Sequence, residues 1–434
     1  MTILVRGGRV VDPSAGLDGV LDILIKDGTI AAFGPKLDVS AERTIDAAGL
    51  FIVPGFIDMH VHLREPGFEA KETIASGARA AARGGFTTIC AMPNTNPVND
   101  DRATTERILA EARRAAVVNV LPIAAVSRGS KGEDLVDMAG LAAAGAVAFS
   151  DDGLPVATSR LMRRALEGAA AFGRLVIDHC EDRALAAGGV MHEGAVSARL
   201  GLPGISSAAE EIVIARDIIL AEALGTRVHI AHLSTAGGVR MVAAAKARGV
   251  RVSAEATPHH LLLTDAAVEG GDANFKMNPP LRTAADVAAL VDGIRTGVID
   301  VIATDHAPHT AEEKGRRFDR APFGVVGLET AVALILDRFV RPNILSLGRV
   351  VELLAANPAR LLGLPGKGRI AVGADADLTV LDPDLPMTVN KDIFESKGRN
   401  TPFHGWKLRG GTAMTIVGGR VVYPFDGRGP ASRP

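Results

Sequence analysis

The sequence predicts an α/β fold, a (β/α)8 barrel of the TIM type with a small β-sandwich domain built from both ends of the chain. The middle of the chain alternates short apolar strands with Ala-rich helical stretches, which is the pattern of a parallel sheet with crossover helices. Eight such strand–helix units over about 310 residues fit a closed barrel with insertions. Each end instead carries short strands with tight turns and is too short to bury one face of a sheet alone.

The two ends have the same texture of short apolar runs separated by glycine-containing turns. Asp27-Gly28 between two apolar runs is a strong signal for a β-hairpin. The strands expected in the two ends are 3–5, 21–25, 29–33, 376–381 and 414–422. We therefore expect residues 1–52 and 365–434 to form one β-sandwich, and residues 53–364 to form a barrel domain inserted between them.

The expected barrel contains eight strands, and intervening stretches with helical composition. The strands are 56–62, 87–92, 118–125, 146–150, 175–178, 227–232, 251–255 and 300–305. The clearest helical stretches are 70–83, 104–116, 159–172, 208–224 and 238–248. The structural alternative is an open doubly wound sheet, but no Gly-x-Gly-x-x-Gly phosphate loop follows the first strand to support it.

Composition narrows the class of protein. The chain has 434 residues, of which 47% are hydrophobic and 23% charged, as in a globular protein with a sizeable core. A net charge of −2 without a basic run argues against a nucleic-acid surface. Two cysteines predict a reducing compartment, and neither a signal peptide nor a membrane-length apolar run is visible. We expect a cytoplasmic protein without nucleic-acid or membrane partners.

The strongest local signal is His60-Val61-His62 on the first barrel strand. Side chains alternate faces along a strand, so the two imidazoles point the same way while Met59 and Val61 face the other way. Two imidazoles on one face can bind one metal ion. For a lone histidine a core or surface role would be the better interpretation, so the signal depends on ligands from later strands.

Later strands do supply such ligands. The C-terminal ends of barrel strands converge on one mouth, so residues there are neighbours despite large sequence gaps. The ligand-type residues at these ends are His60, His62, Asp151, Asp152, His179, His232 and Asp305. Imidazole nitrogens and carboxylate oxygens suit zinc, and Asp152 or Asp305 could bridge two ions. Five strands ending in such residues favour one shared site over five unrelated turns.

The remaining histidines and Cys180 carry weaker signals. His229 lies three residues before His232, so alternation places it on the opposite face, in a structural role. His259 and His260 could support the metal ligands or belong to a loop. Cys180 is predicted to be a small core residue.

Other strand ends carry polar groups without ligand chemistry, namely Arg64, Asn94, Asn278 and His309. An arginine fork matches a carboxylate with two parallel hydrogen bonds, so a small anionic substrate is indicated. Asn94 and Asn278 could equally serve turns, since each stands in a proline-containing segment.

Five segments in combination resemble bacterial dihydroorotases (type I) of the amidohydrolase superfamily. They are DMHVHLREPG at 58–67, AMPNTNP at 91–97, FSDDG at 149–153, DHCED at 178–182 and TDHAPH at 304–309. The resemblance extends over essentially the whole chain. It implies metal ligands at His60, His62, His179, His232 and Asp305, and substrate contacts from His62, Arg64, Asn94, Asn278, His309 and the Phe323-Gly324 backbone.

One departure separates this sequence from similar hydantoinases and allantoinases. Those relatives place a lysine, carboxylated to bridge two metals, at the end of strand four, whereas residues 148–153 contain none. In the subgroup that the chain resembles an aspartate bridges instead, and the motif register points to Asp152 rather than Asp151. The resemblance implies one or two zinc ions, with two favoured.

The activity implied is the reversible, zinc-dependent cyclisation of N-carbamoyl-L-aspartate to (S)-dihydroorotate in pyrimidine (UMP) biosynthesis. Asp305 would be the catalytic acid and base, and residues 310–320 could form a lid or a plain surface loop. One alternative is activity on hydantoin or allantoin, which the missing lysine and Arg64 disfavour. Another is an inert partner of aspartate transcarbamoylase, although every ligand histidine is present. The chain could also form a homodimer or associate with aspartate transcarbamoylase.

Overall fold

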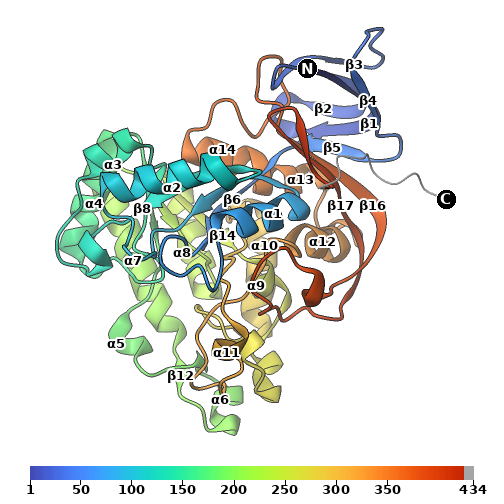
Figure 1. Cartoon of the computed structure of the whole chain (residues 1–434). Coiled ribbons are helices and arrows are strands. Elements are labelled where there is room, and N and C mark those ends of the chain that lie inside the picture. Colours follow the sequence, from blue (N-terminus) through green and yellow to red (C-terminus); the bar gives the residue numbers. More distant parts are fainter. Residues whose placement is uncertain (425–434) are drawn as a thin grey trace.

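The computed structural model describes residues 1–424 and shows a barrel ringed by helices, with a large sheet at one side (Figure 1). Eight parallel strands follow one another in the order β6-β7-β8-β9-β10-β13-β14-β15. They are β6 (Phe56–Val61), β7 (Phe86–Ala91), β8 (Asn119–Ala124), β9 (Ala148–Phe149), β10 (Leu175–Asp178), β13 (Val228–Ile230), β14 (Val252–Ala256) and β15 (Val301–Ile302). Val61 pairs in parallel with His306, just after β15, and this contact joins the last strand to the first.

Helices between the strands cover the outside of the barrel. They include α1 (Ile74–Gly84), α2 (Arg102–Ala115), α4 (Ser159–Ala171), α7 (Ser207–Leu224), α8 (Ala236–Ala247) and α10 (Ala284–Thr296). Each begins after a Ser, Thr or Asp whose side chain accepts a hydrogen bond from a backbone N–H of the first turn, for example Thr73 before α1 and Asp101 before α2. Their apolar faces pack on the outward side chains of the strands in the largest core cluster.

Apolar side chains also fill the barrel interior. Ile57, Cys90, Ile123 and Ile177 come from strands around the whole barrel, and such side chains can meet only inside it. Helix α14 (Asn357–Leu362) adds Leu361 and Leu362 to the same cluster. The interior is therefore a packed core, which leaves the C-terminal ends of the strands as the place for a site.

The two ends of the chain form one mixed sheet, in the order β18-β17-β16-β5-β1-β2-β3, with β4 paired to β1. The strands are β1 (Thr2–Asp12), β2 (Leu17–Lys26), β3 (Thr29–Gly34), β4 (Arg43–Asp46), β5 (Phe51–Pro54), β16 (Leu378–Thr388), β17 (Lys407–Val417) and β18 (Arg420–Tyr423). The N-terminal and C-terminal parts join where Ile52 of β5 lies opposite Val380 of β16. The predicted fold class is confirmed, whereas the domain boundaries at residues 52 and 364 stay a prediction.

Shorter elements complete the described chain. They are α3 (Met138–Ala144), α5 (Arg183–Ala186), β11 (Met191–His192), α6 (Ala195–Leu200), β12 (Gly204–Ile205), α9 (Pro258–Leu262), α11 (Ala311–Lys314), α12 (Ala331–Ile335) and α13 (Leu347–Val351). Helices α12 and α13 each continue into a π-helical turn, at Leu336–Val340 and Glu352–Ala356. Within residues 1–424 no helix combines the length and the apolar character needed to cross a membrane.

Candidate active site

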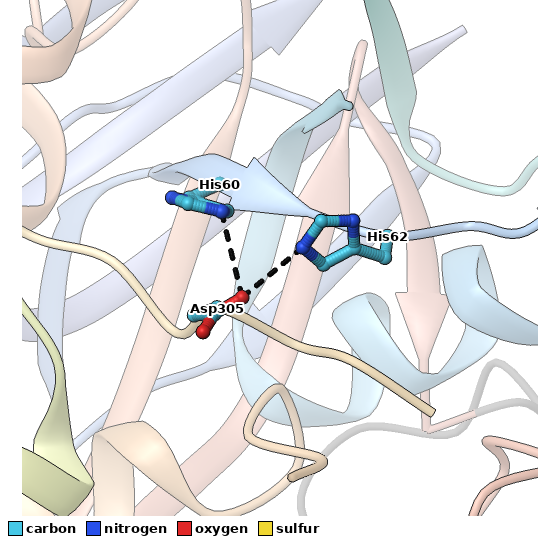
Figure 2. Close-up of side chains that lie close together, drawn as sticks. All are labelled: His60, His62 and Asp305. Atoms are coloured by element: carbon cyan, nitrogen blue, oxygen red, sulfur yellow. Dashed lines mark hydrogen bonds and ion pairs between the residues drawn. The ribbon is translucent and has the colours of Figure 1, made fainter. Parts of the chain in front are cut away.

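His60 and His62 lie side by side at the end of β6, and this strand contains a bulge. Asp58 is opposite Ile89 of β7, but Val61 is opposite Ala91, so β6 carries one extra residue between these pairs. Met59 therefore joins the apolar interior, although strict alternation predicts that it faces away from both histidines. The two imidazole centroids are 5.4 Å apart, and both rings face the carboxylate of Asp305 across the mouth (Figure 2).

Three residues at the mouth of the barrel have a left-handed backbone conformation, which is unfavourable for residues other than glycine. Arg64, His232 and Asp305 have positive φ values of 63°, 30° and 47°. They make up half of the six non-glycine residues with positive φ in the described chain. Such conformations cost roughly 1–3 kcal/mol each and persist where the surroundings impose them, commonly at functional sites. The strain thus marks the mouth independently of residue chemistry.

Asp152, which follows β9, lies between two pairs of histidines. Its Oδ2 atom is 3.3 Å from Nε2 of His60 and 3.4 Å from Nε2 of His62. Its Oδ1 atom is 3.6 Å from Nδ1 of His179 and 3.4 Å from Nε2 of His232. One carboxylate oxygen of Asp152 therefore faces His60 and His62, and the other faces His179 and His232. A carboxylate placed in this way could bridge two metal ions.

Asp305 lies on the same side as the first pair. Its Oδ1 atom is 3.1 Å from Nε2 of His62 and 3.4 Å from Nε2 of His60 (Figure 2). Burial alone would raise the pKa of Asp305, yet the neighbouring histidines lower it to about 2. The carboxylate is thus ionised at neutral pH and can accept a proton.

Asp151 has a different role from its neighbour. It accepts hydrogen bonds from the backbone N–H groups of Val126 and Ser127, at 2.8 and 3.0 Å, and from the Ser127 hydroxyl at 2.5 Å. These bonds fix the loop after β8. Of the two adjacent aspartates, only Asp152 lines the cavity at the mouth.

Glu255 on β14 supports the cluster and was not among the residues predicted from the sequence. Its Oε1 atom accepts from Nδ1 of His60 at 2.7 Å and from the backbone N–H of His232 at 3.2 Å. Its Oε2 atom is 3.2 Å from Nε2 of His229. The bond to Nδ1 leaves Nε2 of His60 as the free ligand atom. A charged residue at the end of a barrel strand was the signal that could have revealed Glu255.

The expectation that His229 faces away from the site is wrong. Strand β13 ends at Ile230, so the alternation rule does not extend to His232, whose φ of 30° turns the chain. His229 points into the barrel, where it contacts both Ser253 and Glu255. It therefore supports the site indirectly, through the same carboxylate that orients His60.

The cluster fits a cation. Nε2 of His60 and Oδ1 of Asp152 are buried and make no hydrogen bond within residues 1–424. Buried polar atoms are normally satisfied, and imidazole nitrogen together with carboxylate oxygen is a donor set for divalent metals. Burial alone would lower the pKa of His60, yet the surrounding carboxylates raise it well above its ordinary value. This excess of negative charge is what a divalent cation would balance.

A cavity of about 220 Å³ opens above these residues. Its walls contain every predicted substrate contact, namely His62, Arg64, Asn94, Asn278, His309, Phe323 and Gly324. Within the described chain no carboxylate oxygen lies within 4.0 Å of the Arg64 guanidinium, and burial lowers its pKa to about 10. Arg64 instead contacts the Pro308 carbonyl at 3.3 Å and Nε2 of His309 at 3.5 Å. The cavity thus presents an unpaired cation beside the carboxylate–histidine cluster.

The other wall residues are held by specific partners. The Asn94 carbonyl oxygen accepts from Nδ1 of His62 at 2.8 Å, which leaves Nε2 of His62 facing Asp305. Asn278 donates to Glu181 at 2.7 Å. Gly324, at φ +127°, could not be another residue, because a Cβ there would lie 2.8 Å from the Cβ of Ala307.

His309 lies between two acceptors. Its Nδ1 is 3.1 Å from the Glu313 carboxylate and its Nε2 is 2.8 Å from the Phe323 carbonyl. Glu313 in turn pairs with Lys71 at 2.8 Å. Burial, reinforced by Arg64 and Lys71, lowers the pKa of His309 to about 3. In its neutral form the imidazole carries one N–H and can donate to only one of these two acceptors, so His309 acts as a hydrogen-bonding group of the wall.

Four more histidines lie outside the cavity wall. His260 hydrogen-bonds to Thr257 and to the Pro279 carbonyl, and His192 contacts Arg282. The ring of His259 packs against that of His260 with centroids 4.5 Å apart. His404 is exposed. None of the four lines the cavity.

Comparisons with known proteins show the family to which the chain belongs. A family model described as "Dihydro-orotase-like" matches residues 49–237, and one described as "Amidohydrolase family" matches residues 221–423. The chain is 58% identical over 422 residues to a dihydroorotase of Pelotomaculum thermopropionicum, covering 97% of this chain and 98% of that one. It is 51% identical over 428 residues to a dihydroorotase of Syntrophus aciditrophicus, with coverage of 98% and 100%.

Solved structures of similar fold are named hydantoinase or dihydropyrimidinase. The L-hydantoinase (dihydropyrimidinase) from Arthrobacter aurescens is 29% identical with a TM-score of 0.88, and the match covers 97% of this chain and 95% of that one. The dihydropyrimidinase from Brevibacillus agri is 27% identical with a TM-score of 0.85, at the same coverage. Given the identities to curated relatives over nearly the whole length, the chain belongs to the dihydroorotase family, metal-dependent cyclic amide hydrolases within the amidohydrolases.

Proposed function

We propose that this chain catalyses the reversible cyclisation of N-carbamoyl-L-aspartate to (S)-dihydroorotate and water, in the de novo synthesis of UMP. The observation that carries the proposal is the Arg64 guanidinium, which has no carboxylate partner within 4.0 Å in the described chain and lines the same cavity as Asp152 and Asp305. Both the ring and its open form keep a free carboxylate that matches this arginine. The names of the relatives at 58% and 51% identity support the same reaction.

We infer that two zinc ions would be held here. His60, His62 and Asp305 would hold one, and His179 with His232 the other, since the two oxygens of Asp152 face these two groups. When bound, zinc supplies Lewis-acid chemistry that activates water and polarises the amide carbonyl. Nε2 of His60 and Oδ1 of Asp152, which are buried and make no hydrogen bond within residues 1–424, support this assignment.

The protein's own groups would perform the remaining work. Arg64, Asn94 and His309 would hold the substrate carboxylate, so that the ring carbonyl lies over Asp305. In hydrolysis, Asp305 takes a proton from the attacking water and gives it to the ring nitrogen as the C–N bond breaks. In cyclisation the same proton moves back. His62 and Asn278 would complete the wall around the ring.

We further propose residues 53–364 as the catalytic domain, flanked by the sandwich parts 1–52 and 365–434, in a cytoplasmic enzyme. Both cysteines, Cys90 and Cys180, are free and buried, which supports a reducing compartment.

Replacing Arg64 with methionine tests the substrate assignment. Removing one partner of a buried charge pair costs about 2–5 kcal/mol, so KM for dihydroorotate should rise roughly 30-fold or more while the metal content stays normal. Hydantoin lacks the carboxylate, so its turnover by wild type should be far lower and insensitive to the substitution. Arg317→Met, at an 85% exposed side chain, serves as the control. An unchanged KM in Arg64→Met would favour hydantoin-like substrates instead.

Glu255→Gln tests how the metal ligands are oriented. The amide keeps the shape of Glu255 but weakens its bonds to His60 and His229. Loss of such a supporting carboxylate typically costs 10- to 100-fold in metal affinity, to be measured by competition with a chelator. Glu329→Gln, another buried glutamate that lies away from the cavity, should leave the affinity unchanged. Equal affinities for the two variants would exclude this role of Glu255.

A further inference from the structure

Two lysines lie behind the cavity wall without an acidic partner. Within residues 1–424 neither Lys276 nor Lys314 has a carboxylate oxygen within 4.0 Å of its ammonium nitrogen. Lys276 is only 3% exposed. Buried lysines without an acidic partner are rare, because the charge loses its hydration. Burial lowers the pKa of both, that of Lys314 to about 7, where the neighbouring Lys276 adds repulsion. Lys314 is half-buried, so both ammonium groups need hydrogen bonds from the protein in place of water.

Lys276, in the long segment after β14, reaches across to the segment after β15. Its Nζ atom donates to the carbonyl oxygens of Phe318 at 2.8 Å, Asp319 at 3.3 Å and Ala321 at 2.7 Å. The ammonium also lies 4.6 Å from the ring centroid of Phe323. All three N–H donors of this ammonium are therefore used on the backbone of one neighbouring loop.

Lys314 makes the reverse connection. Its Nζ atom donates to the carbonyl oxygens of Ala273 at 2.8 Å and Lys276 at 3.1 Å, in the segment after β14, and to that of Pro322 at 2.9 Å. The backbone N–H of Gly324 donates to the Lys276 carbonyl at 2.9 Å. The two ammonium groups thus satisfy six carbonyls and join the two loops in both directions.

These contacts surround the substrate-facing part of the wall. Asn278 is two residues after Lys276, and Phe323-Gly324 directly follows Pro322. The Phe323 carbonyl contacts Nε2 of His309, so the position of this loop also sets that of the His309 ring. A shift of the two loops relative to each other would move groups on both sides of the cavity.

We propose that Lys276 and Lys314 are positioning residues, which hold residues 310–324 as a fixed wall of the substrate cavity rather than a moving lid. The proposal rests on the proposed function, because it assigns this wall to dihydroorotate. Neither lysine lines the cavity, so both would act through the backbone and side chains that they hold.

Lys276→Met and Lys314→Met test the proposal in the metal-loaded enzyme. Methionine keeps most of the side-chain volume and removes all three donors. We expect KM for dihydroorotate to rise tenfold or more, kcat to fall by a smaller factor, and metal content to stay normal. Trypsin should also cut faster after Arg316, Arg317 and Arg320, the exposed arginines of the wall. Lys276→Arg and Lys314→Arg keep a charge and several donors and should recover part of the KM loss.

The matched control is Lys246→Met. Lys246 is also partly buried and donates to a backbone carbonyl, that of Gly297, and to Asp300, at the opposite end of the barrel strands. A KM for Lys276→Met and Lys314→Met within twofold of that for Lys246→Met would overturn the proposal. If the methionine variants fail to fold, Lys276→Gln and Lys314→Gln decide, because glutamine removes the charge and shortens the reach to the carbonyl oxygens. A wild-type KM together with wild-type trypsin resistance in both glutamine variants overturns the proposal equally. A wild type that does not turn over dihydroorotate would refute the proposed function instead.

Discussion

His60→Ala is expected to abolish activity and to lower the metal content of the purified protein. The imidazole is fully buried, and its Nε2 atom lies 3.3 Å from Asp152 and 3.4 Å from Asp305. Glu255 holds the opposite edge of the ring, so Nε2 of His60 is fixed toward these two carboxylates. Metal analysis and a dihydroorotate hydrolysis assay on the same preparation measure the effect. His192→Ala removes a buried histidine that contacts Arg282, away from the cavity, and controls for stability.

His179→Ala extends the same experiment to the second pair of imidazoles. His179 faces the Oδ1 atom of Asp152, whereas His60 faces Oδ2, so the two substitutions remove ligands from different sides of one carboxylate. With two ions bound, wild type should contain about two equivalents of zinc and each variant about one. If wild type binds a single ion, it should contain about one equivalent of zinc, and both variants should lose it. Normal zinc and full activity in either variant would remove that histidine from the ligand set.

Most of the barrel could be predicted because its strands are continuous apolar runs and the helices between them are rich in alanine. Even β9 and β15, each two residues long, stand in longer apolar stretches at 146–150 and 300–305. The helical region from Ala331 to Leu362 was not predicted. Its side chains are buried on most sides, so it lacks the polar face from which an amphipathic helix is recognised.

The site could be predicted as far as residue chemistry at strand ends allows. Strict period two is lost where the backbone departs from a regular strand, at the bulge before Val61 and at the positive φ of His232. These departures explain the errors at Met59 and His229. Glu255 was missed because a single carboxylate carries no motif, and only the fold brings it within 2.7 Å of His60. Lys276 and Lys314 were missed because hydrogen bonds to backbone carbonyls leave no pattern in the sequence.

Asp305→Asn separates proton transfer from metal binding. Asparagine keeps the size of the side chain and one oxygen that can still act as a ligand, but it cannot accept a proton. The neighbouring histidines lower the pKa of Asp305 to about 2, so the wild-type carboxylate is ionised at neutral pH and can take up a proton. We therefore expect a folded protein, partly retained metal and a kcat lower by about a hundredfold or more.

The two directions of the reaction provide an internal check on this variant. A catalyst cannot change the equilibrium between ring and open form, so kcat/KM for hydrolysis and for cyclisation must fall by the same factor. A general acid or base is expected to show its loss mainly in kcat, whereas a residue that only orients the substrate would show it mainly in KM. Metal analysis of the same sample separates both from simple ligand loss. A fully metal-loaded Asp305→Asn variant with kcat within a few-fold of wild type would show that another group carries the proton. Within 4.0 Å of Asp305 that leaves His60 and His62 as the nearest candidates, and both already serve as metal ligands in the proposed mechanism.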